Sequence, residues 1–110
     1  MLAKNLRLDR KEFNRIFKEG KTFHSDFLFA KILKENRVGN NFSVSVPTKV
    51  SKKAAGRNKL RRRGYSIIKN NLTNLKGGSS VIVILKKGAE ELNFDEYKKE
   101  MESLLKKISK

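Results

Sequence analysis

The chain has 110 residues and a mass of 12.7 kDa, which predicts one domain, residues 1–110, with a modest core. The absence of cysteine excludes disulfides and thiolate zinc sites, and the one histidine, His24, cannot build a multi-histidine metal site. Lys and Arg number 27 against 11 Asp and Glu, so we expect a polyanionic partner. Because no apolar run is long enough for a signal peptide or a membrane helix, we expect a cytoplasmic protein that binds no membrane.

The first predicted element is a helix over residues 10–19. Asp9 is a favourable N-cap, and Glu12 follows three residues later, as in a capping box. Gly20 is expected to close the helix in the left-handed conformation. The apolar residues at helical spacing form one stripe: Phe13, Ile16 and Phe17.

Two strands are predicted next. Residues 27–33 are almost continuously apolar, and residues 42–46 alternate between apolar residues and serine. The turn-like residues 36–41 between them favour an antiparallel hairpin, which Pro47 ends. A short strand near residues 21–23 could extend the sheet.

The second predicted helix combines an apolar seam with a polar, mostly cationic side. Gly64 lies on the seam, where either close packing against the sheet or a local kink would explain it. The other seam residues are Leu60, Ile67, Ile68, Asn71, Leu72 and Leu75. The opposite side carries Asn58, Lys59, Arg62, Arg63, Ser66, Lys69 and Asn70.

A strand and a helix complete the chain. Residues 81–85 are all apolar, which indicates a strand buried on both faces or central in the sheet. Asn93 and Glu96 then predict a capping box. The expected core stripe of this helix is Phe94, Tyr97, Met101, Leu104, Leu105 and Ile108. The order α-β-β-α-β-α predicts an α+β fold in which helices pack on a sheet.

The positive charge is concentrated in the middle of the chain. Residues 36–89 contain thirteen Lys and Arg but no Asp or Glu, and residues 49–63 contain eight of those cations. Folding such a block costs Coulomb repulsion, which a phosphate backbone would relieve. A phosphate-binding surface is therefore favoured over a solvated face that only keeps the protein soluble. The candidate residues for binding a nucleic acid are Lys49, Lys52, Lys53, Arg57, Asn58, Lys59, Arg61, Arg62 and Arg63.

Aromatic residues near this block could stack on unpaired bases. For Phe13 and Phe17 the pattern leaves two interpretations open, since aromatic residues at helical spacing are also typical of a core. No set of residues suggests catalysis by the protein itself. We therefore expect no catalytic residue and no metal ligand in this chain.

The basic segment resembles the signature of the bacterial ribonuclease P protein family. In the basic segment the matching residues are Thr48, Lys49, Lys53, Ala54, Ala55, Arg57, Asn58, Lys59, Arg61 and Arg62. A second match lies upstream and consists of Leu8, Glu12, Phe13, Ile16, Phe17, Gly20 and Lys21. The chain departs from the family where an arginine is replaced by Lys59, and where Tyr65 stands at a frequent arginine position.

This resemblance implies an α/β sandwich with a left-handed βαβ crossover. It implies the accessory protein of an endoribonuclease, in which a catalytic RNA hydrolyses the phosphodiester bond that joins the 5′ leader to precursor tRNA. Mg²⁺ would be bound mainly by that RNA, and no obligate protein partner is expected. The basic helix would face the catalytic RNA. A cleft between the first helix and the sheet would take the leader, with Phe13, Phe17 and a strand residue, Phe29 or Ala30.

Two other functions remain as alternatives at this point. A small ribosomal protein could use the same basic helix without any link to catalysis. An architectural DNA-binding protein would also be basic, although it would not need a cleft for a single strand.

Overall fold

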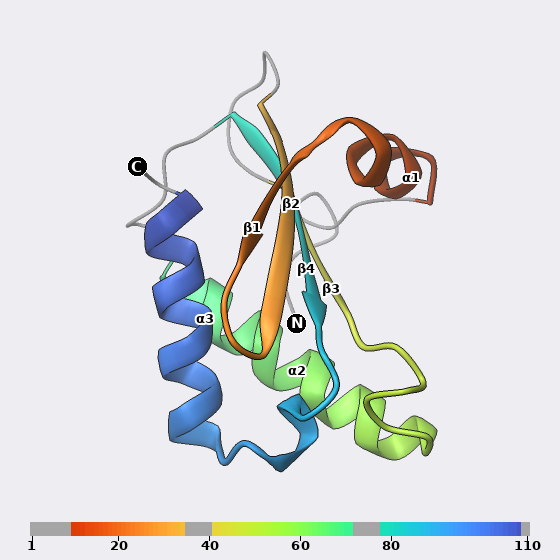
Figure 1. Ribbon diagram of the computed structural model, residues 1–110, viewed down its shortest axis with the longest axis vertical. Coiled ribbons are helices and arrows are strands. Elements are labelled where there is room, and N and C mark those ends of the chain that lie inside the picture. Colours follow the sequence, from red (N-terminus) through yellow and green to blue (C-terminus); the bar gives the residue numbers. More distant parts are fainter. Residues whose placement is uncertain (1–9, 35–40, 72–77, 109–110) are drawn as a thin grey trace.

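The computed structural model describes residues 10–34, 41–71 and 78–108 (Figure 1). The described elements follow the predicted order and include the short additional strand, so the α+β prediction is confirmed. They are α1 (Arg10–Glu19), β1 (Lys21–His24), β2 (Leu28–Lys34), β3 (Asn41–Ser45), α2 (Ala54–Asn70), β4 (Ser79–Leu85), the 3-10 helix η3 (Ala89–Glu91) and α3 (Phe94–Ile108).

The four described strands form one sheet in the order β1-β2-β4-β3. β4 pairs antiparallel with β2 and parallel with β3. The predicted hairpin between residues 27–33 and 42–46 is therefore wrong, because β4 lies between those two strands. Every residue of β4 is buried, and a strand of this kind is best accommodated at the centre of a sheet. Most of the predicted turn, residues 36–40, lies outside the described residues.

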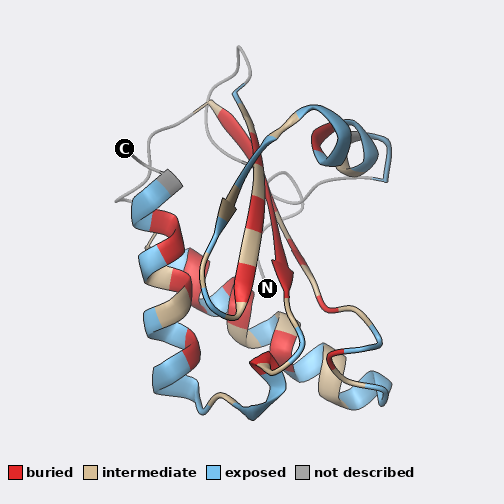
Figure 2. Ribbon diagram, viewed as in Figure 1, coloured by how far each residue is buried: buried red, intermediate tan, exposed pale blue. Residues whose placement is uncertain are grey.

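α2 connects β3 to the parallel strand β4, which makes the βαβ unit implied by the family resemblance. α2 and α3 cover one face of the sheet, and α1 lies against part of the other face (Figure 1). The larger core lies on the α2 and α3 side (Figure 2) and includes Leu28 and Ile32 of β2. A smaller cluster, made of Ile16, Ile82 and Ile84, attaches α1.

The end of α1 differs from the prediction. Gly20 is absent from the glycines with positive φ, which among the described residues are Gly78 and Gly88. A Cβ atom at Gly20 would lie 2.7 Å from the carbonyl oxygen of Ile16 and 2.9 Å from that of Ile32. Glycine is thus needed for the close approach of α1 to β2. The predicted cap, Asp9, lies outside the described residues.

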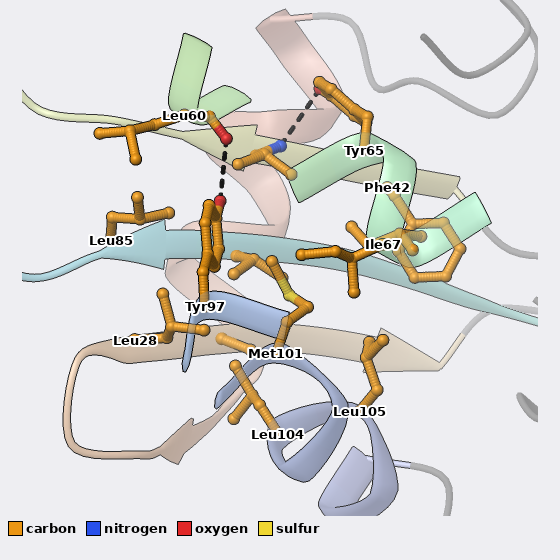
Figure 3. Close-up of a cluster of buried hydrophobic side chains, with 14 of the residues drawn as sticks. Leu28, Phe42, Leu60, Tyr65, Ile67, Leu85, Tyr97, Met101, Leu104 and Leu105 are labelled. Carbon is orange, nitrogen blue, oxygen red and sulfur yellow. Dashed lines mark hydrogen bonds between the residues drawn. The ribbon is translucent and has the colours of Figure 1, made fainter. Parts of the chain in front are cut away.

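Gly64 lies at a crowded contact between α2, α3 and β3. A Cβ atom there would lie 2.6 Å from the Tyr97 hydroxyl oxygen and 3.0 Å from Cγ1 of Val44, so the close-packing interpretation is confirmed. The Tyr97 hydroxyl donates a hydrogen bond of 2.9 Å to the Leu60 carbonyl oxygen (Figure 3). Burial raises the pKa of Tyr97 well above its ordinary value, which keeps this donor protonated.

Tyr65 of α2 packs against the outer edge of the sheet at β3. It is buried, and its hydroxyl oxygen accepts a hydrogen bond of 3.1 Å from the backbone N–H of Val44 in β3. β3 is the last of the described strands on this side of the sheet, so Tyr65 supplies this N–H with a partner that no described strand provides. The residue that departs from the family's frequent arginine therefore serves the packing of α2.

α3 begins with the predicted capping box. The side-chain oxygen of Asn93 accepts from the N–H of Glu96 at 2.8 Å, and the Glu96 carboxylate accepts from the N–H of Asn93 at 3.0 Å. Tyr97, Met101, Leu104 and Leu105 are buried as predicted. Phe94 is not, because 42% of its surface is exposed. The described residues of α2 that line the same hollow as Phe94 are all polar: Lys59, Arg62, Arg63 and Ser66.

We expect Gly64→Val to lower the free energy of unfolding by about 1–3 kcal/mol, since the added atoms would overpack the contact with Tyr97 and Val44. Urea denaturation measures the change. The matched control is Ser66→Val, which places the same side chain on the exposed side of α2 and should change stability by less than about 0.5 kcal/mol. Equal stability of the two variants would contradict the packing argument.

Candidate nucleic-acid interface

The described residues cover only part of the sheet face beside α1. Strand pairing places two cross-strand rows on this face: His24, Phe29, Ile84 and Ser45 in one, and Thr22, Lys31, Ile82 and Ser43 in the other. Ile82 and Ile84 at the centre are buried by α1, whereas Thr22 and His24 at the β1 edge are exposed. The face therefore offers hydroxyl, imidazole and ammonium groups around an apolar centre. We call it the open face.

α1 forms a wall of this face with two aromatic rings. Phe13 and Phe17 stack with 6.2 Å between ring centroids and 15° between ring planes. Phe13 is half-buried, but 43% of the Phe17 surface is exposed. The ammonium nitrogen of Lys31 lies 5.5 Å from the centroid of the Phe17 ring. Of these two rings, Phe17 is thus the one more available to a ligand.

Phe29 lies on the open face, half-buried against Ile16, Ile82 and Ile84. Ala30, the other strand residue suggested by the resemblance, is buried in the larger core on the opposite side. The structure therefore brings Phe13, Phe17 and Phe29 to one face.

Sequence reasoning missed the polar members of the open face, among them Lys31 and His24. Lys31 follows Phe29 by two residues, so strand periodicity could have placed the two on one side. The His24 ring lies 5.9 Å from the Phe29 ring. That proximity depends on the pairing of β1 with β2, which the sequence only suggested.

The predicted RNA-binding residues lie along α2 and the segment just before it. Lys49, Lys52 and Lys53 are exposed in that segment. On the helix, Asn58, Lys59 and Arg62 are exposed, while Arg57, Arg61 and Arg63 are half-buried. The buried residues Leu60, Gly64, Tyr65, Ile67 and Ile68 attach the other side of α2. We call this continuous set, from Lys49 to Arg63, the basic surface.

Two arginines of the basic surface make hydrogen bonds within it. Arg57 donates to the carbonyl oxygens of Ser51 at 3.0 Å and Lys52 at 2.8 Å, which fixes the segment that carries Lys52 and Lys53. Arg61 donates to the side-chain oxygen of Asn58. No described carboxylate pairs with a cation of α2, and α2 itself contains no Asp or Glu. Within the described part of the chain, ion pairs therefore do not neutralise the positive charge of this surface.

A cavity of about 770 Å³ lies between α2 and the edge of the sheet, lined by Ser43, Val44, Ala55, Asn58, Arg61, Arg62 and Tyr65. Ser43 also belongs to the open face, so this cavity links that face to the basic surface. The N-terminal end of α2 adds partial positive charge nearby. The arrangement suits a phosphate backbone that passes from one surface to the other.

The described residues contain no group of three His, Asp or Glu side chains that could hold a metal ion. Among the described helices, none is both long and apolar enough to cross a bilayer.

Comparison with known proteins identifies one family. The family model described as Ribonuclease P matches residues 2–109. The ribonuclease P protein component of Microcystis aeruginosa is 31% identical over 104 residues, covering 91% of this chain and 87% of that protein. That of Rickettsia canadensis is 32% identical over 109 residues, covering 90% of this chain and 92% of that protein.

Solved structures show the same fold. The RNase P protein of Thermotoga maritima aligns with a TM-score of 0.86 at 29% identity, covering 94% of this chain and 98% of the other. That of Staphylococcus aureus aligns with a TM-score of 0.86 at 21% identity, covering 96% and 98%. The chain belongs to the ribonuclease P protein family, the protein component of an endoribonuclease of tRNA 5′ processing.

Proposed function

We propose that this protein binds the catalytic RNA of ribonuclease P through the basic surface and holds the 5′ leader of precursor tRNA on the open face. The observation that carries the proposal is the placement of nine predicted RNA-binding residues on one helix and its leading segment, without a described carboxylate partner. The family favours this function over the ribosomal and DNA-binding alternatives.

Each part of the basic surface suits a different contact with RNA. The exposed cations Lys53, Lys59 and Arg62 can neutralise phosphates directly. In the cavity beside β3, the Asn58 amide and the Arg61 guanidinium already contact each other, so they meet a ligand as a fixed pair. Arg57 contributes indirectly: its hydrogen bonds to backbone carbonyl oxygens hold the segment that presents Lys52 and Lys53 to the RNA.

The open face suits a single strand rather than a duplex. An unpaired base can stack on the exposed ring of Phe17, while the Lys31 ammonium beside that ring neutralises a neighbouring phosphate. The hydroxyls of Thr22, Ser43 and Ser45 can hydrogen-bond to ribose or phosphate without distinguishing bases. Leader binding of this kind would depend weakly on sequence.

The chemical step belongs to the RNA in this proposal. Mg²⁺ held by the RNA would support hydrolysis of the phosphodiester bond. The protein contributes substrate affinity, and its positive charge lowers the repulsion between leader and catalytic RNA. Precursor tRNA should therefore be bound and cleaved at lower Mg²⁺ concentration when the protein is present.

Reconstitution with the catalytic RNA of the same organism tests the function. We expect wild-type protein to restore leader cleavage at a Mg²⁺ concentration too low for the RNA alone. The matched variant replaces Lys53, Lys59 and Arg62, all exposed, with alanine, and should lose much of this gain while keeping its fold. Absence of any gain with wild-type protein would remove the proposal.

Arg62 and Arg57 should affect RNA binding in different ways. Arg62→Ala removes an exposed cation, so the slope of log affinity against log salt should fall by about 0.7–0.9 for one lost phosphate contact. Arg57→Ala should also speed amide exchange in residues 51–53, since it removes two hydrogen bonds to that segment. Lys99→Ala, an exposed cation on α3, is the control and should leave both quantities unchanged. A normal salt slope for Arg62→Ala would show that this side chain is only solvated.

Phe17→Ala should weaken binding of leader-bearing substrate by about 5-fold to 150-fold, the range for loss of one stacked base. Binding of mature tRNA should not change, and the melting temperature should change little, because the ring is 43% exposed. Phe17→Trp should retain the affinity. A lower melting temperature with unaltered leader binding would instead assign Phe17 to the support of α1.

A further inference from the structure

Phe94 is an exposed aromatic residue that the proposed function does not use. Among the described residues, Phe94 and Phe17 are the two exposed large apolar side chains, at 42% and 43%. They lie on opposite sides of the sheet, because Phe17 belongs to α1 and Phe94 begins α3. Each ring has a cation beside it: Lys31 lies 5.5 Å from Phe17, and the guanidinium carbon of Arg63 lies 5.8 Å from Phe94.

Phe94 lines a second hollow. This hollow has a volume of about 280 Å³ and is lined by Lys59, Arg62, Arg63, Ser66 and Phe94. Three cations and one hydroxyl thus come from α2, and the aromatic ring comes from α3. No carboxylate of the described residues lines the hollow, although α3 has Asp95 and Glu96 in the same turn as Phe94. The hollow therefore offers a ligand the face of an aromatic ring next to three positively charged side chains.

This combination matches an unpaired nucleotide better than other polyanions. A phosphate alone would use the cations but leave the exposed ring without a role. A duplex would present its phosphates while its base faces stay stacked and inaccessible. An unpaired nucleotide offers both groups, since its base can stack on an aromatic ring or a guanidinium plane while its phosphate meets Lys or Arg.

We propose that the hollow between α2 and α3 binds an unpaired nucleotide of the catalytic RNA, with the base against Phe94 and Arg63 and the phosphate near Lys59 and Arg62. This inference rests on the proposed function. The catalytic RNA is the source because Arg62 lines both this hollow and the cavity of the basic surface. The leader is assigned to the open face, on the other side of the sheet from α3.

The test compares two single substitutions, Phe94→Ala and Phe17→Ala, in full-length protein. Two affinities are measured for each: that for the catalytic RNA alone, and that of the reconstituted holoenzyme for leader-bearing substrate. Phe94→Ala should weaken binding to the catalytic RNA by about 5-fold to 150-fold without changing the salt slope, since no charge is lost. The intrinsic substrate affinity of the holoenzyme, measured with the RNA saturated by protein, should stay unchanged. Phe17→Ala should show the reverse pattern.

Two further measurements make the outcome decisive. Phe94→Trp should retain the affinity for the catalytic RNA, and thermal melting should show that Phe94→Ala remains folded. Unchanged affinity of Phe94→Ala for the catalytic RNA would overturn the inference while leaving the proposed function intact, provided that Arg62→Ala still lowers the salt slope. Loss of leader affinity instead would overturn the assignment to the catalytic RNA. If wild-type protein does not bind the catalytic RNA, the proposed function fails first.

Discussion

The contact between Tyr97 and the backbone of α2 determines where the positive charge of this protein lies. The Tyr97 hydroxyl reaches the Leu60 carbonyl oxygen beside Gly64, where a side chain would not fit. Tyr65 fixes the same helix to the edge of β3. Because Tyr97 and Tyr65 fix the apolar side of α2 against α3 and β3, the helix cannot rotate about its own axis. Lys59 and Arg62 must then face solvent, and no described carboxylate is placed to pair with them.

This arrangement has an electrostatic cost for the free protein. Several cations on neighbouring turns of α2 repel one another, and half of the chain contains no acidic residue that could compensate. A polyanion that binds the folded protein relieves the repulsion and stabilises the fold by mass action. The stability of α2 and the affinity for RNA are therefore coupled, and high salt should weaken binding while it eases the repulsion.

The features that the sequence predicted well are local. The helix α1, the capping box of α3 and the cationic side of α2 each depend on residues within a few positions of one another. The hairpin prediction failed because sheet order depends on which strand is most apolar overall, and β4 displaces β3 from β2. Contacts between residues far apart in the sequence could not be predicted either. The Glu100 carboxylate accepts hydrogen bonds from Ser25 and Phe27, more than seventy positions away, and so holds the turn between β1 and β2.

For the aromatic residues, periodicity alone could not separate a buried ring from an exposed one, and the structure separates them by what covers each ring. Phe42 is fully buried in the larger core, whereas Phe17 and Phe94 are at helical core spacing yet remain exposed. In both exposed cases a cation from a neighbouring element takes the place where an apolar partner would pack. Burying these rings would require that charge to lose water, which costs more than the apolar contact returns. The cation beside each ring thus accounts for its exposure, and under the proposed function the same cation would meet a phosphate when a base stacks on the ring.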